Sequence, residues 1–198
     1  MSAILGPIHY WLYNKIQFQD NLVKSLASKL GCEEVINVNT QIGALPGGDL
    51  QDIIDEGNIH GWLQDKIHLV ESRLSFVVES LCSKGVSMEQ IGEVAYEVGA
   101  KSTVLTPDTS AAEAYKFLND TLIDGMPCDH INTLQVQEVD LVEWCRSRNI
   151  HEEYWNEESR ALNRFDLIRD QLIQGLLSTT ELTYVNDNNR VFKIIGRD

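Results

Sequence analysis

Two histidines occupy the same place in two similar segments of the chain. Residues 6–16 align without gaps on residues 57–67, and seven of the eleven positions are identical, among them His9 with His60 and Trp11 with Trp62. A neutral imidazole binds transition metals and accepts protons. An internal repeat indicates a duplicated structural unit, so we expect two similar helices whose first turns bring both histidines to one site.

A bend at residues 125–130 adds further residue types that bind metals. Its Cys128, Asp129 and His130 offer a thiolate, a carboxylate and an imidazole within three consecutive positions. Combined with the two helix-start histidines, this set suits tetrahedral zinc or, with mixed ligands, non-haem iron. The predicted metal ligands are His9, His60, Cys128 and His130. The alternative is that both histidines are buried capping residues and that the bend is an ordinary turn, in which Asp129 caps main-chain groups.

Each predicted helix also carries one carboxylate on its apolar face, Asp20 in the first and Glu71 in the second, eleven residues after the histidine. Eleven residues span about 16 Å of helix, so the histidine and the carboxylate of one helix cannot bind the same ligand. If the helices pack antiparallel, Asp20 and Glu71 meet as candidate catalytic residues, because burial and repulsion raise the pKa of one of them. If the helices are parallel, the histidines meet instead. The alternative for both carboxylates is exposure to solvent or pairing with Lys24 or Arg73.

The hydrophobic pattern predicts a mostly α fold: a helical bundle with an internal helix duplication and a small C-terminal antiparallel β element (α+β), in a single domain over residues 1–198. The duplicated helices cover 6–30 and 57–81, and residues 126–198 form a strand, a long helix and a terminal hairpin. A helix through Trp144 would also accept the residues of that first strand. The predicted helices span 6–30, 57–84, 87–99, 108–125 and 151–177, and the predicted strands span 131–139, 182–185 and 190–195.

The chain of 198 residues has a formal net charge of −14. This charge repels phosphate backbones and anionic membrane surfaces, so we expect neither nucleic acid nor a membrane as partner. No apolar run approaches the roughly 18 residues of a membrane span, and the N-terminus lacks the features of a signal peptide. The four cysteines form no CxxC pair, which is typical of reduced thiols in a cytoplasmic protein.

Two classes of function follow from these residues. The first is a metal-binding protein, with zinc or iron as cofactor, that acts as an enzyme or a sensor on a small molecule in a pocket lined by Tyr10, Trp11 and Trp62. The second is a non-catalytic scaffold, in which the two helices with Trp11 and Trp62 as anchors form a homo-oligomer or bind a partner protein. The sequence names no reaction.

Overall fold

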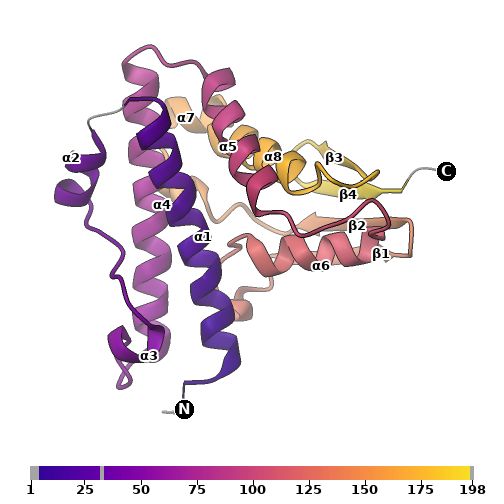
Figure 1. Ribbon diagram of the computed structural model, residues 1–198, viewed down its shortest axis with the longest axis horizontal. Coiled ribbons are helices and arrows are strands. Elements are labelled where there is room, and N and C mark those ends of the chain that lie inside the picture. Colours follow the sequence, from indigo (N-terminus) through magenta and orange to yellow (C-terminus); the bar gives the residue numbers. More distant parts are fainter. Residues whose placement is uncertain (1–4, 32–33, 197–198) are drawn as a thin grey trace.

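The computed structural model describes residues 5–31 and 34–196, and over these residues it has eight α-helices and one four-stranded antiparallel sheet. Two long helices, α1 (Pro7–Lys29) and α4 (Ile59–Ser83), lie side by side at one end of the molecule (Figure 1). The sheet and α6 (Ala111–Thr121) form the other end, and α5 (Met88–Ser102) and α8 (Arg164–Leu176) lie between the two ends. The expected α+β class is confirmed. The origin of α1 and α4 by duplication stays a prediction.

The helices begin and end at residues that satisfy their free main-chain groups. Pro7 opens α1, and the side chain of Asn58 accepts a hydrogen bond from the amide of Gly61 at the start of α4. Ser87 and Gln90 form the predicted capping box of α5. Gly31 follows α1 with a φ of 67°, a conformation that glycine adopts without strain.

The two long helices run in the same direction. The rings of His9 and His60, near the two helix starts, lie 5.6 Å apart between centroids. Further along both helices, Nε of Arg73 donates to Oδ1 of Asp20 at 2.9 Å. Two contacts in the same order along both helices require parallel packing, as Figure 1 also shows. Of the two arrangements left open by the sequence, the parallel one is therefore found.

The sheet has the strand order β1-β2-β4-β3, with every neighbouring pair antiparallel. Strand β1 (Asn132–Gln137) confirms the first predicted strand, and β3 (Thr183–Asp187) and β4 (Val191–Ile195) confirm the terminal hairpin. Asn188 and Asn189 turn the hairpin with positive φ. Strand β2 (Leu141–Arg146) was not predicted, although its alternating burial buries Val142 and Trp144 on one face.

The single long helix expected over 151–177 is wrong. The segment contains η2 (Glu152–Tyr154), α7 (Glu157–Ala161) and α8, with Asn163 between α7 and α8. Asn163 has a φ of 51°, and a residue in this left-handed region cannot continue an α-helix. The other short described elements are α2 (Glu34–Gln41), α3 (Leu50–Ile53) and η1 (Pro127–Asp129). Among the described residues, no helix is both long and apolar enough to cross a membrane.

Candidate functional site

Four ionisable side chains, brought together from four segments of the chain, form a buried network. Nδ1 of His151 donates to Oε1 of Glu71 at 3.0 Å, and Nε2 of His151 lies 3.6 Å from Oδ1 of Asp124. The other oxygen of Asp124 accepts from Arg169 at 2.8 Å and from Asn132 at 2.9 Å. The side chains of Glu71 and His151 are each 1% exposed, and those of Asp124 and Arg169 are 12% and 14% exposed.

Local sequence explains how these groups reach the interior. Leu122 and Ile123 are buried where α6 ends, so Asp124 enters the interior directly after them. Gly125 then reverses the chain with a φ of 75°; a Cβ at this position would overlap side-chain atoms of Asp129 and Ile150. The ring of His151 stacks on Phe165 with centroids 3.9 Å apart, which fixes the orientation of the imidazole.

Neighbouring charges outweigh the effect of burial on the pKa of His151 and of Asp124. Burial lowers the pKa of His151, but Glu71 and Asp124 outweigh that effect, so its pKa lies above the ordinary 6.5. Burial raises the pKa of Asp124, but Arg169 and His151 outweigh it and hold its pKa well below the ordinary 3.8. Two carboxylates therefore face two cations. Burying charges costs several kcal/mol per ion before pairing, and such clusters are enriched at functional sites.

Beside the network lies a cleft of about 350 Å³, which we call the polar cleft. It is lined by one face of α4, the bend after α6 and the segment that leads into η2, and its most buried lining side chains include Glu71 and His151. Oε2 of Glu71 is buried and has no hydrogen-bond partner among the described residues. The lining residues are Gln64, Ile67, Glu71, Gly125, Asp129, Arg148, Asn149, Ile150, His151, Glu153 and Tyr154.

Polar side chains at the edge of the polar cleft are held by mutual contacts. The hydroxyl of Tyr154 forms a hydrogen bond with Nδ1 of His68, whose Nε2 lies 3.1 Å from the amide nitrogen of Gln64. Burial and the neighbouring Glu153 raise the pKa of Tyr154, so its hydroxyl stays protonated at neutral pH. The exposed Arg148 lies 3.6 Å from Asp129 across the bend. Hydrogen-bonding groups thus surround the opening.

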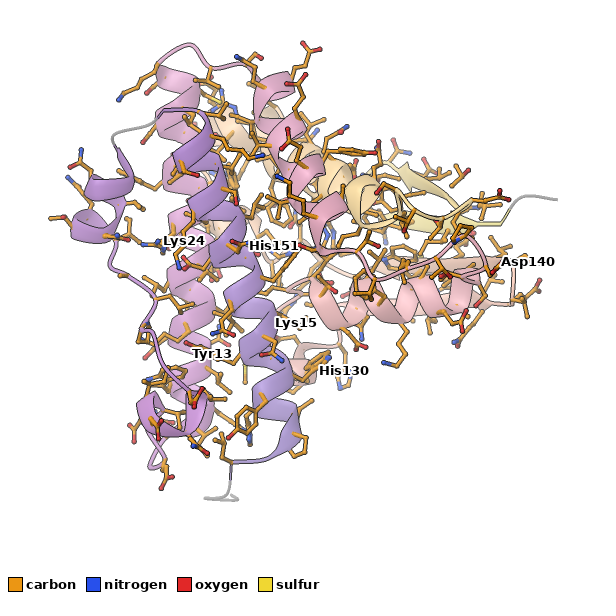
Figure 2. All side chains as sticks on the ribbon, in the orientation of Figure 1. Tyr13, Lys15, Lys24, His130, Asp140 and His151 are labelled. Atoms are coloured by element: carbon orange, nitrogen blue, oxygen red, sulfur yellow. The ribbon has the colours of Figure 1, made fainter. Side chains whose placement is uncertain are left out.

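Lys15 is a further buried cation near this network. It is 3% exposed, and its Nζ lies 3.9 Å from the centre of the Trp11 ring. Figure 2 shows it on the side of α1 that faces α6. Burial lowers its pKa to about 8, although the charge of Asp124 opposes that effect. Lys15 does not line the polar cleft.

The two carboxylates predicted from the sequence lie in separate networks. Asp20 pairs with Arg73 at 2.9 Å and with Lys24 at 2.8 Å, which is the alternative weighed for it, whereas Glu71 pairs with His151. Asp20 and Glu71 lie at similar levels of the two parallel helices, because Asp20 reaches Arg73, two positions from Glu71, but the two carboxylates bind different partners. Arg73, which lies on α4, also donates to Asn39 of α2 at 2.7 Å. Its two contacts, with Asp20 and Asn39, therefore join α1, α2 and α4. Glu71 alone of the two lies at a cleft.

The predicted metal ligands come together only in part. His9, His60 and Cys128 line one cavity of about 220 Å³, together with Met126 and Pro127. The exposed His130 does not line it. In the described part of the chain, no three His, Cys, Asp or Glu side chains are arranged to hold a metal ion. A metal centre at these residues stays a prediction.

The three aromatic residues predicted to line a pocket have other described neighbours, and a pocket formed by them stays a prediction. Nε1 of Trp11 donates to Asp120 at 2.9 Å, and the ring of Trp62 packs on Tyr13 with centroids 5.6 Å apart. Tyr10 is 39% exposed. None of the three lines the cavity between His9 and His60. The two tryptophans instead fasten α1 and α4 to their neighbours, and an oligomer or scaffold role for them is untested.

Sequence reasoning missed the central members of the network: Asp124, His151 and Arg169. His151 is 80 positions from Glu71 and 27 from Asp124, so no spacing rule joins them. One signal was available, because His151, Phe165 and Arg169 lie in a segment whose apolar pattern predicted burial. Comparison with protein-family models, with curated proteins and with solved structures finds no match to this chain.

Proposed function

We propose that this protein binds a small nitrogen-bearing molecule, such as an amine or an amidine, in the polar cleft. The observation that carries the proposal is Glu71, which lines a cleft of about 350 Å³ and whose buried Oε2 has no hydrogen-bond partner among the described residues. A buried charged acceptor without a donor costs free energy in the empty protein. A ligand N–H group that reaches this carboxylate would remove that cost and so contribute to binding.

The charges around the cleft favour a cationic ligand. Three carboxylates line it, Glu71, Asp129 and Glu153, against the two cationic groups Arg148 and His151. Both ring nitrogens of His151 already face carboxylates, Nδ1 at 3.0 Å from Oε1 of Glu71 and Nε2 at 3.6 Å from Oδ1 of Asp124. The excess of carboxylates over cationic groups in the lining disfavours a carboxylate or a phosphate.

The volume of the cleft sets the size of the ligand. Sites for drug-sized molecules span roughly 300–1,000 Å³, so a cleft of about 350 Å³ suits a molecule at the small end of that range. The stacked ring of His151 and its bond to Glu71 hold the acceptor in place before the ligand arrives. Such preorganisation lowers the entropic cost of binding.

The test is a titration of uniformly ¹⁵N-labelled protein with n-propylamine, acetamidine and propionate, followed by NMR. We expect the amine and the amidine to shift the amide signals of Gly125, Ile150 and Tyr154, and propionate to leave them in place. Equal or larger shifts with propionate would contradict the proposed charge preference.

The matched variants are Glu71→Gln in the cleft and Glu93→Gln on the exposed side of α5. Loss of a charged acceptor costs about 1.5–3 kcal/mol, so Glu71→Gln should weaken amine binding roughly tenfold or more, whereas Glu93→Gln should not change it. Circular dichroism confirms that both variants are folded. A folded Glu71→Gln protein with unchanged amine affinity would overturn the proposal.

A further inference from the structure

A second cavity lies between the starts of α1 and α4 and shares no lining residue with the polar cleft. We call it the twin-histidine cavity, because His9 and His60 lie at it, 5.6 Å apart between ring centroids. Its volume is about 220 Å³. Leu12, Leu63 and Met126 give it apolar sides, so it combines two imidazoles with a hydrophobic interior.

The hydrogen bonding of His9 shows which kind of group this ring can bind. Its Nδ1 accepts a hydrogen bond from the amide of Gly6 at 2.9 Å, so a neutral ring carries its proton on Nε2. His9 is 9% exposed and lines the cavity. A ring of this tautomer that lines a cavity offers a donor, Nε2–H, to an acceptor bound there. It does not bind a metal cation unless the Gly6 hydrogen bond is broken.

The two helices reinforce this preference. His9 lies in the first turn of α1 and His60 in the first turn of α4, and the helices run parallel, so both N-termini meet at the same cavity. A helix N-terminus carries partial positive charge and free amide groups, which stabilise anions and repel cations. Two such ends side by side favour an anionic group between the two rings.

We infer that the twin-histidine cavity binds a short aliphatic carboxylate. The carboxylate accepts hydrogen bonds from Nε2 of His9 and from His60, and the alkyl chain packs against Leu12, Leu63 and Met126. This explains why imidazoles and apolar side chains share one cavity. The inference concerns a site and a ligand charge different from those of the polar cleft and does not depend on the proposed amine binding.

The test uses hexanoate as the probe, with hexylamine and hexanol as analogues of the same chain length, in calorimetric titrations of the full-length chain. We expect hexanoate to bind most tightly, hexanol more weakly, and hexylamine not at all. His60→Ala should weaken hexanoate binding at least tenfold. His130→Ala is the matched control, because His130 is an exposed histidine in the neighbouring bend outside the cavity, and it should leave the affinity unchanged.

His60 is itself exposed, so its replacement should leave the fold intact, and thermal unfolding checks this. Met126→Gln, which makes the half-buried side of the cavity polar, should also weaken hexanoate binding and leaves both histidines in place. Equal affinity for hexylamine would overturn the inference. So would one equivalent of cobalt or zinc that binds to the wild type and is lost in both His60→Ala and Cys128→Ser, since that result identifies a metal site.

Discussion

Replacing Asp124 by Asn should strongly destabilise the protein. The substitution preserves the shape of the side chain but removes a charge that pairs with Arg169 at 2.8 Å and faces His151 at 3.6 Å. Breaking a buried ion pair by removing one partner costs about 3–5 kcal/mol, because the other charge is left uncompensated. Chains of this size lose roughly 2–4 °C in Tm per kcal/mol, so Tm should fall by roughly 6–20 °C.

The free energy of unfolding should be measured by urea denaturation near pH 6, followed by tryptophan fluorescence and circular dichroism. At about this pH Asp124 is ionised, since its pKa lies below 3.8, and His151 is protonated, since its pKa lies above 6.5. Both charges of the network are then present in the folded wild type, and the full effect of the substitution is observed.

Asp120→Asn is the control, because Asp120 pairs with the exposed Lys116, has a side chain that is 36% exposed, and is replaced by a residue that keeps an oxygen to accept from Trp11. Solvent screening limits such surface pairs to about 1 kcal/mol or less. If Asp124→Asn costs no more than Asp120→Asn, the network is not desolvated and the reasoning fails. A double substitution of Asp124 and Arg169 should cost less than the sum of the single ones, because the two charges depend on each other.

Three further predictions concern titration and packing. The stabilising effect of His151, measured against His151→Gln, should be complete below about pH 6.5 and decline as the pH rises through the raised pKa of the folded state. Urea denaturation of both proteins near pH 6 and near pH 9 tests this. A stabilising effect that grows with pH would contradict it. The pH dependence of the Lys15 contribution has the opposite sign, because folding lowers the pKa of Lys15 from 10.5 to about 8 and the unfolded chain therefore binds more protons between these values. The wild type should gain stability relative to Lys15→Met as the pH rises through this range. A stability difference that stays constant with pH would refute the burial of this charge. At the crossing of α5 and α8, a Cβ on Gly175 would overlap the main-chain oxygen of Tyr96, so Gly175→Ala should lower the free energy of unfolding by about 1–3 kcal/mol or more. Gly92→Ala is the control and should have a smaller effect, because a Cβ on Gly92 meets only the flexible side chain of Gln171. Equal losses for the two variants in thermal unfolding would contradict the close approach of these helices.

The candidate site combines predicted and unpredicted residues. Glu71 was singled out because a carboxylate interrupts an otherwise apolar helix face, and the structure buries it at a cleft. The convergence of His9 and His60 was one of two arrangements that the sequence allowed. Asp20, chosen by the same criterion as Glu71, lies in the contact with Arg73 instead. A pattern along one helix marks a buried polar residue but does not identify the partner that another element brings to it.

The sequence by itself determined the features that depend on neighbours a few residues away. These features include the capping box of Ser87 and Gln90 and the asparagine turn between β3 and β4, which form through contacts between nearby residues. They also include the apolar faces of α1 and α4, which follow from the spacing of apolar residues along each helix. Tertiary structure decided the direction in which α1 and α4 pack and the meeting of Glu71 with His151. The connector between the two helices permits either direction, and the direction is selected by the summed burial of many side chains. The charges that gather at the cleft follow from that global packing, which no local pattern records.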